Sequence, residues 1–504
     1  MDIVTAQEMY EWDQVAIKSA GIEGKILMES AGRAAADVIE RRIPEHHKVV
    51  VLIGAGNNGG DGFVIARTLL NRGYEVEAWQ VAADEKISGD AIVHKEIFLA
   101  SGYSLFQLND WDALTQSLEK ADVIVDAMLG IGAKGPLRSP FNEIVELVNK
   151  QNSCRIAVDL PTGVPADEGI EEFDGVRADL TVVIAALKMS AVVQHTRPFY
   201  GEIEMVEIGL PVRKLRHPER LVWQRHDVKR SLPERMTNSH KGSHGKGLMV
   251  GGSDLMPGSI AMSAKAALRS GAGLLTVATA KEVIPSVSSY VQEATFLAMS
   301  ETAGKITGHI KDDLQGFDAA AVGMGLGRHP EAQELIEELL EQIEAPLLID
   351  ADGLFHLKEL FDKVAQRPYP TILTPHPGEF ARLLGKPIKT IMQSPFAYCR
   401  SFACKHRVYL VLKGPATIIT SPEGKQRVDL TGNAGLAKGG TGDVLSGILL
   451  AMVLQGGSIL DGISNGCFIH GTTAELLTDE QHAMRDLLAT DVVEGLSQTF
   501  RTFS

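Results

Sequence analysis

The sequence is poor in cysteine, in long apolar runs and in net positive charge, and each shortage excludes a class of protein. Four cysteines occur in 504 residues, and no pair has the C-x-x-C spacing of a zinc or redox site. So few cysteines are typical of a reducing compartment, and we expect a cytoplasmic protein. The apolar runs are far shorter than the roughly 20 residues of a membrane helix, and the acidic N-terminus is unlike a signal peptide. With a net charge of −15, we expect no nucleic-acid surface and no membrane partner.

The length and the charge pattern predict more than one domain. A hydrophobic content of 44% is enough for a sizeable core. A basic stretch with several prolines, between residues 212 and 247, interrupts the otherwise acidic chain. We interpret it as a linker followed by the first strand of the next domain, rather than as a nucleic-acid arm. The expected organisation is a domain over residues 1–215, a linker over 216–224 and a domain over 225–504.

Apolar strands alternate with helices in both halves, which predicts an α/β fold in each. Continuous apolar strands of this kind belong to parallel sheets covered on both faces. In the first half they are KVVVLIGAG, YEVEAWQVA and residues 121–127, 155–161, 178–187 and 201–209. In the second half they are residues 247–252, 273–279, 318–325, 345–351, 371–375 and 407–414.

Three strand ends in the first half carry the groups expected at a ligand site, because ligands of parallel sheets bind beyond the carboxyl ends of the strands. The first strand is followed by GAGNNGGDG, which contains G-x-G-x-x-G and opens a helix whose free amides favour anions. No acid ends the second strand, EAWQVA, so a hydride-transfer dehydrogenase is disfavoured. Asp159 is the candidate acid/base, with a turn or helix-cap aspartate as the alternative. Oxygens of Asn58, Asp126 and Thr162 are candidates for holding a monovalent cation.

In the second half, the informative motif is GNAGLAKGGTGDVLSG, residues 432–447. Its glycines lead into an apolar helix whose first amides form an anion site, and Asp443 lies in the first turn, where the helix dipole favours its ionised form. Such a carboxylate can take a proton from a hydroxyl that attacks a phosphate. A simple glycine-rich helix cap is the alternative. Lys413 is a candidate phosphate ligand or a surface hairpin lysine, and His376 is a candidate substrate ligand.

These motifs resemble two known enzyme families. GNNGGDG, VDAMLGIGAKGP and VDLPTG, in this order, resemble the NAD(P)H-hydrate epimerase domain over about residues 1–215, which implies a Rossmann-like three-layer parallel-sheet fold. HKGSHGKG, GGS, GMGLG, TPHPGE, KGPAT and GGTGD resemble the ribokinase-like superfamily over about residues 225–504. Within it they are similar to the ADP-dependent NAD(P)H-hydrate dehydratase. The sequence departs from these families in having Thr162 for serine, Met324 for proline and Ser259 for alanine.

The resemblance implies roles for individual residues. In the first domain, the residues expected to contact the hydrated dinucleotide are Asn57, Asn58, Gly59, Gly60, Asp61, Gly130, Ile131, Gly132, Ala133, Lys134, Gly135, Pro136 and Asp159. Potassium is expected at Asn58, Asp126 and Thr162, and Asp159 is expected to be the acid/base. In the second domain, the expected hydrate ligands are Ser259, Gly325, His376 and Asp443, with Asp443 as the catalytic base. The expected ligands of the adenylate are Lys413, Gly414, Pro415, Ala416, Thr417 and Gly442.

The activity that the resemblance implies is repair of hydrated NADH and NADPH (NADHX and NADPHX). The first domain would interconvert the R and S hydrates, and the second would dehydrate the S hydrate with ADP, releasing AMP and phosphate. The expected cofactors are potassium and magnesium, and we expect a homo-oligomer. One alternative is an ATP-dependent small-molecule kinase fused to a dinucleotide-binding module, because GGTGD does not distinguish stable phosphorylation from phosphorylation followed by elimination. Another is a first domain that only senses a dinucleotide or binds a protein.

Overall fold

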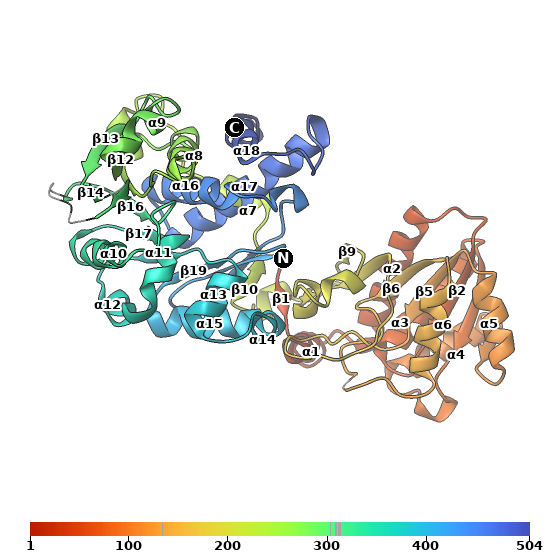
Figure 1. Cartoon of the computed structure of the whole chain (residues 1–504). Coiled ribbons are helices and arrows are strands. Elements are labelled where there is room, and N and C mark those ends of the chain that lie inside the picture. The colour runs from red at the N-terminus through yellow and green to blue at the C-terminus, as the bar shows by residue number, and fades with distance from the viewer. Residues whose placement is uncertain (134, 303, 308–309, 311–313, 504) are drawn as a thin grey trace. The chain divides into compact units, whose positions relative to one another are not determined.

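The structure is a computed structural model that describes residues 1–133, 135–302, 304–307, 310 and 314–503 (Figure 1). It contains two compact units, Met1–Pro218 and Glu219–Ser504. Part of the segment 216–224 belongs to the second unit, because β10 (Arg220–Val222) pairs with a strand of that unit's sheet. Both units are built on largely parallel sheets, and the α/β class predicted from the sequence is confirmed.

The first unit contains a seven-stranded sheet in which every neighbouring pair is parallel. In spatial order its strands are β4 (Leu105–Gln107), β3 (Glu75–Gln80), β2 (Lys48–Ile53), β5 (Val123–Ala127), β6 (Cys154–Val158), β7 (Leu180–Ile184) and β9 (Glu202–Val206). The chain runs outward from β2 in one direction and from β5 in the other. The switch point between β2 and β5 is therefore the expected ligand site of such a sheet.

Helices cover both faces of this sheet, as the continuous apolar strands predict. Alternate residues of β2 enter two different cores: Val49 and Val51 pack on one face, and Val50 and Leu52 on the other. The first core also holds side chains of α2 (Gly24–Arg42), α3 (Asn57–Asn71) and α4 (Asp90–Ala100). The second holds side chains of α5 (Trp111–Glu119) and α6 (Phe141–Lys150).

The N-terminal segment lies outside the large sheet. Strand β1 (Ile3–Val4) pairs in parallel with β8 (Leu187–Lys188) and leads into α1 (Ala6–Gln14), which continues as a π-helix over Val15–Ser19. A capping box begins α1: the hydroxyl of Thr5 accepts a hydrogen bond from the Glu8 amide, and the carboxylate of Glu8 accepts one from the Thr5 amide. This segment therefore has a defined conformation before the first strand of the large sheet.

The second unit contains a ten-stranded sheet with an antiparallel edge. In spatial order its strands are β10, β21 (Gln426–Asp429), β20 (Thr417–Thr420), β19 (Tyr409–Leu412), β18 (Thr371–Leu373), β17 (Leu347–Ile349), β16 (Ala319–Val322), β11 (Lys246–Val250), β12 (Leu274–Ala280) and β13 (Thr295–Met299). Strand β20 is antiparallel to both of its neighbours, and the strands from β19 to β13 are parallel. The direction of the chain changes between β11 and β16, which makes this the switch point.

Helices pack on this sheet at the switch point. The central pair is α8 (Pro257–Arg269) and α16 (Thr441–Leu454), which contact each other and β11 (Figure 1). The other helices are α7 (Arg225–Ser231), α9 (Ile284–Ser288), α10 (Pro330–Gln342), α11 (Asp352–Phe355), α12 (Phe361–Gln366), α13 (Pro377–Leu384), α14 (Ile388–Gln393), α15 (Pro395–His406), α17 (Ile459–Glu480) and α18 (Ala489–Arg501). A short antiparallel pair, β14 (Glu301–Thr302) and β15 (Lys305–Ile306), lies apart from the main sheet. No helix within the described ranges is both long and apolar enough to cross a membrane.

Candidate active sites

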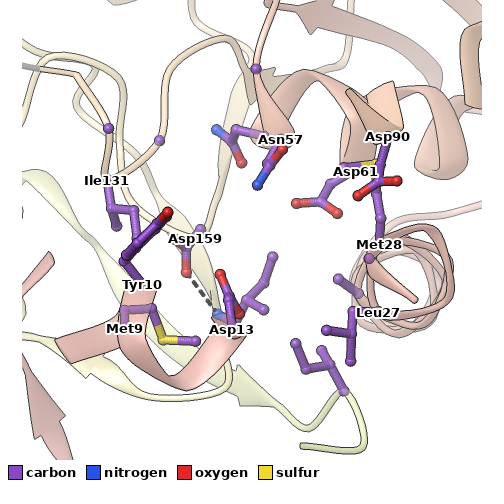
Figure 2. Close-up of a pocket in the computed structure, with 18 of the residues that line it drawn as sticks. Met9, Tyr10, Asp13, Leu27, Met28, Asn57, Asp61, Asp90, Ile131 and Asp159 are labelled. Carbon is purple, nitrogen blue, oxygen red and sulfur yellow. Dashed lines mark hydrogen bonds between the residues drawn. The ribbon is translucent and has the colours of Figure 1, made fainter. Parts of the chain in front are cut away.

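The first unit has a cavity of about 570 Å³ at the switch point of its sheet (Figure 2). Its walls come from α1, from the start of α3, from the loop after β5 and from the ends of β6 and β7. Of the residues predicted to bind the hydrate, those that line the cavity are Asn57, Asn58, Asp61, Gly130, Ile131, Gly132, Ala133 and Asp159. Lys134 lies outside the described residues, and Gly135 and Pro136 are not among the lining residues.

Gly59 and Gly60 are buried, and they allow close packing rather than lining the cavity. The helix α3 already begins at Asn57, so both glycines lie in its first turns. A Cβ atom on Gly59 would lie 2.0 Å from the Gly54 carbonyl oxygen, and one on Gly60 would lie 2.2 Å from the sulfur of Met28. The sequence predicts that these two glycines contact the dinucleotide, but neither lines the cavity. Their lack of a side chain instead lets α3 approach the preceding loop and α2.

Asp159 points into the cavity from the end of β6 and forms a buried ion pair with Lys188 (Figure 2). Its backbone has φ = 68°, a region that few non-glycine residues adopt and that is found at functional sites. Lys188 is 1% exposed and also donates to the carbonyl oxygens of Ile184 and Ala186, at 3.0 and 3.1 Å. Within the described residues, the hydrogen bonds to the carboxylate all go to Oδ1, so Oδ2 is left to face a ligand. Asp159 is thus neither a helix cap nor a simple turn residue.

Three further carboxyl groups, those of Asp13, Asp61 and Asp90, line the same cavity (Figure 2). Burial, followed by the negative charge of Asp159, raises the pKa of Asp13 to about 6. The same two causes, joined by Asp13, raise the pKa of the fully buried Asp61 well above its usual value. The cavity therefore holds one ion-paired carboxylate and two carboxyl groups that keep their protons to higher pH, the kind of set that supports acid/base chemistry.

Asp126, Thr162 and Asn58 come together beneath the loop that follows β5. Asp126 is fully buried, and its carboxylate accepts hydrogen bonds from the Thr162 hydroxyl at 2.6 Å and from the Thr162 amide at 2.8 Å. Asn58 donates to the Leu129 carbonyl oxygen at 3.0 Å, while its own Oδ1 is buried with no hydrogen-bond partner. A carboxylate, a hydroxyl, a carbonyl and an unpaired amide oxygen are the hard oxygen donors that suit an alkali cation.

In the second unit, Asp443 lies in the first turn of α16, as the sequence predicts, and contacts α8. The hydroxyl of Ser259 hydrogen-bonds the Asp443 carboxyl, and Ser263 donates to the Asp443 carbonyl oxygen at 2.8 Å. The expectation that the helix dipole favours ionised Asp443 is wrong in its net effect. Burial, together with the nearby carboxylate of Asp350, raises the pKa of Asp443 to about 6, so these effects outweigh the dipole.

Asp350 is a residue of this site that the sequence analysis missed. It follows β17, is 1% exposed, and accepts hydrogen bonds from Lys413 at 2.9 Å and from Ser446 of α16 at 2.5 Å. Burial opposes its charge, but Lys413 and Ser446 outweigh burial and lower the pKa of Asp350. A carboxylate at the end of the apolar strand APLLIDA was the available signal, of the same kind that singled out Asp159.

Lys413 is largely buried at the end of β19 and is not a surface hairpin lysine. Burial lowers its pKa, but Asp350, Glu379 and Asp443 outweigh burial and leave the pKa of Lys413 raised. A Cβ atom on Gly442 would lie 3.5 Å from the Lys413 ammonium nitrogen, so this cation lies beside the start of α16. Gly414, Pro415 and Ala416 form the turn that follows, and Thr417 begins β20 and donates to the Gly414 carbonyl oxygen at 3.2 Å.

Gly325 and His376 are placed by local structure. Gly325 has φ = 66°, and a Cβ atom there would lie 2.7 Å from the Met256 carbonyl oxygen and 3.2 Å from the Cβ of Ser259. The loop after β16 therefore packs on the start of α8, next to the serine that contacts Asp443. His376 caps α13: its Nδ1 accepts hydrogen bonds from the amides of Gly378 and Glu379, and Glu379 accepts one from the His376 amide. The side chain of His376 is half exposed, and its Nε2 lies 3.5 Å from Oε1 of Glu379.

Among the described residues, no group of three or more His, Cys, Asp or Glu side chains is placed to hold a metal ion. The second unit thus has no carboxylate cage for magnesium within that part of the chain. Mg²⁺ commonly keeps its waters and is bound through substrate phosphates plus one or two carboxylates. Asp350 and Asp443, which act on Lys413 together with Glu379, are carboxylates available for that kind of binding.

Comparisons with known proteins identify both units. Residues 24–190 match the family model described as YjeF-related protein N-terminus, and residues 248–497 match the one described as NAD(P)H-hydrate dehydratase. The bifunctional NAD(P)H-hydrate repair enzyme Nnr of Moorella thermoacetica is 34% identical over 99% of this chain and 97% of its own length. That of Thermofilum pendens is 33% identical over 95% and 93%.

A solved structure agrees for the second unit. The ADP/ATP-dependent NAD(P)H-hydrate dehydratase of Bacillus subtilis, co-crystallised with ATP and Mg²⁺, is 34% identical, with a TM-score of 0.50 over 56% of this chain and 98% of that one. The family assignment made from the motifs is confirmed: the chain belongs to the family of bifunctional NAD(P)H-hydrate repair enzymes.

Proposed function

We propose that the first unit epimerises the hydrates of NADH and NADPH and that the second unit dehydrates the S hydrate with ADP. The observation that carries this proposal is the presence of two separate carboxylate sites in one chain that resembles repair enzymes over 99% of its length: Asp159 at a strand end in the first unit, and Asp443 in the first turn of α16 in the second. Each site provides the proton-transfer group that its half of the repair needs.

The reaction of the first unit concerns C6 of the reduced ring, which carries a hydroxyl group next to the ring nitrogen N1. Stereochemistry at C6 is lost when the N1–C6 bond opens: the hydroxyl gives up its proton, C6 becomes an aldehyde, and N1 gains a proton. Rotation about C5–C6 and closure onto the other face give the second epimer, with no atom gained or lost. Asp159 lines the cavity, and its hydrogen bonds from the described residues go to Oδ1, so Oδ2 is available to accept or return one of these protons.

Dehydration in the second unit needs a better leaving group than hydroxide. Transfer of the terminal phosphoryl group of ADP to the C6 hydroxyl gives AMP, and loss of phosphate together with a C5 proton restores the C5=C6 bond. Asp443 is the base that takes the hydroxyl proton. The raised pKa of Asp443, about 6, makes it a stronger base than an ordinary aspartate. This value is still below neutral pH, so the carboxyl group is largely ionised there. Lys413 and the first amides of α16 are the positive groups for the phosphates.

Potassium and magnesium are the ions that we propose for the two units. Asn58, Asp126 and Thr162, with the Leu129 carbonyl, fit an alkali cation because Asn58 Oδ1 is buried and unpaired. Such an ion would fix the loop after β5 that lines the cavity. Magnesium would neutralise charge on the transferred phosphoryl group when ADP is bound. A cytoplasmic location accords with four free cysteines.

The test is recovery of NADH, followed by its absorbance, from a mixture of both NADHX epimers with ADP and magnesium. Wild type should recover all the cofactor. The Asp443→Asn variant should recover none, and Asp159→Asn should recover one epimer quickly and the other at the rate of the uncatalysed epimerisation. Absence of NADH with both ADP and ATP, with a stable phosphorylated product instead, would refute the repair function and favour the small-molecule kinase.

A further inference from the structure

The N-terminal segment is fastened directly to the strand that carries Lys188. Strand β1 pairs with β8 in a register that places Val4 opposite Lys188. The amide of Ala6, the first residue of α1, donates to the Asp167 carboxylate at 2.8 Å. Trp12 is buried and donates to the Arg216 carbonyl oxygen at 3.1 Å. Helix α1 is thus held at both ends, and the position of its side chains relative to Asp159 and Lys188 is fixed.

Asp13 lies on the side of α1 that faces the cavity (Figure 2). Within the described part of the chain its carboxyl group has no hydrogen-bond or ion-pair partner, although most of it is removed from solvent. A carboxyl group that lies on the cavity wall without a protein partner is available to a ligand in the cavity. The π-helix Val15–Ser19 begins two residues later, and π-helical turns are frequently found at functional sites.

The charged groups around Asp13 come from four other elements. Asp159 follows β6, Lys188 belongs to β8, Asp61 belongs to α3, and Asp90 lines the cavity from the start of α4. Lys188 is already bonded to Asp159 and to two backbone carbonyls, so it does not pair with Asp13. Burial and the charge of Asp159 raise the pKa of Asp13 to about 6, which makes both its protonated and ionised forms accessible near neutral pH.

We propose that Asp13 is a second catalytic residue of the epimerase site and transfers a proton to the hydrated nicotinamide ring in concert with Asp159. The assignment rests on the proposed epimerisation, and Asp13 precedes residues 24–190, the part matched by the family model. In the opening step, Asp159 takes the proton of the C6 hydroxyl, the N1–C6 bond breaks with its electron pair moving to N1, and Asp13 gives its proton to N1. Closure on the other face of C6 reverses both transfers. Lys188 is a positioning residue that holds Asp159.

The experiment uses the full chain and measures the rate at which pure R hydrate of NADHX is converted to the S hydrate, over a range of pH. We expect Asp13→Asn to lower kcat for epimerisation by about 100-fold or more, with KM within about threefold of wild type. We expect kcat/KM of wild type to change with pH near pH 6, where Asp13 titrates, and we expect this change to be absent in Asp13→Asn. In Asp13→Ala, added formate should restore part of the rate, because it supplies the missing carboxyl group. ADP-dependent dehydration of the S hydrate by the same preparations should stay unchanged.

The matched control is Glu11→Gln, which removes a charge from the exposed side of the same helix, where the Glu11 carboxylate accepts a hydrogen bond from the Gln7 side chain. It should keep the wild-type rate and pH profile. The proposal is overturned if Asp13→Asn epimerises within threefold of wild type, or if the Asp13 variants lose activity without rescue by formate, which would indicate a structural role. If wild type itself does not exceed the buffer rate, the proposed epimerase function fails instead. If Asp13→Asn folds poorly, two other measurements test the proposal. Formate should raise the epimerisation rate of Asp13→Ala, and Asp13→Glu should keep the pH dependence of kcat/KM near pH 6.

Discussion

Replacing Asp443 by asparagine should inactivate the second unit and at the same time stabilise it above neutral pH. Burial and Asp350 raise the pKa of Asp443 from its ordinary 3.8 to about 6. Between these values the unfolded chain releases the proton while the folded chain keeps it, so the folded state loses stability as the pH rises through this window. The full cost, about 3 kcal/mol for a shift of about two pKa values, is present above pH 7 and mostly absent below pH 4.

The asparagine variant does not titrate and therefore avoids this cost. Its free energy of unfolding should exceed that of wild type by up to about 3 kcal/mol at pH 8 and by about 1 kcal/mol or less at pH 4.5. Dehydratase kcat should fall by roughly 100-fold to 10,000-fold, because the base is lost. Epimerisation by the first unit should be unaffected.

The chain contains two compact units, so the assay must report on the second one by itself. The full chain is titrated with urea at both pH values and exposed briefly to deuterated solvent at each urea concentration. Mass spectrometry of peptides from α16 then measures their deuterium uptake, which reports the unfolding of the second unit. The matched control is Asp461→Asn, which removes a charge from a partly exposed aspartate paired with Arg427 in the same unit. Equal stability of wild type and Asp443→Asn at pH 8, or a gain that does not diminish at low pH, would refute the reasoning.

Three more substitutions test other parts of the structure. Lys188→Met leaves Asp159 buried without its cation and should destabilise the first unit by about 3–5 kcal/mol. The same deuterium-pulse method, applied to peptides of the first unit, measures this loss. The control is Lys150→Met, which removes an exposed lysine and should change stability little. Thr162→Val removes the hydroxyl bonded to Asp126, so the rise in thermal midpoint that potassium but not sodium gives wild type should disappear; a rise that persists would contradict the proposed ion site. Gly325→Ala forces a side chain into a left-handed position against Met256 and should cost more than about 1 kcal/mol and lower dehydratase activity. Gly316→Ala, also left-handed but with open space around it, should cost less.

The sequence was sufficient to predict what lies along single strands. The apolar runs predicted the central strands of both sheets, and Asp159, which follows one of these strands, does line the cavity. Asp126, near the end of another strand, bonds to Thr162 as the predicted ion site requires. This works because the carboxyl ends of parallel strands meet at one edge of the sheet, whatever the details of packing. The capping box of Thr5 and Glu8 is predictable for a different reason: it depends only on the spacing of residues next to each other in the sequence.

Features that depend on contacts between distant segments were not predictable. Asp13 reaches the cavity because the pairing of β1 with β8 places α1 beside it. No sequence motif in α1 predicts that pairing. The burial of Lys188 in a short strand, and the packing of Gly59 on the loop before α3 and of Gly60 on α2, are likewise products of tertiary packing. The protonation of Asp443 also depends on its surroundings, because the helix position predicts a lowered pKa and burial beside Asp350 reverses it. The homo-oligomer stays a prediction.

The left-handed backbone of Asp159 has a consequence for the mutational tolerance of this position. At φ = 68° the residues that fit without added strain are glycine, asparagine and aspartate, whereas β-branched side chains are excluded by steric repulsion. In a saturation library scored separately for protein abundance and for turnover, asparagine and glycine should be inactive and less abundant than wild type, because each leaves the buried Lys188 without its partner, while valine or isoleucine should be depleted further in abundance by the added backbone strain. Position 159 would then separate the requirement of the fold from the requirement of the chemistry within a single codon.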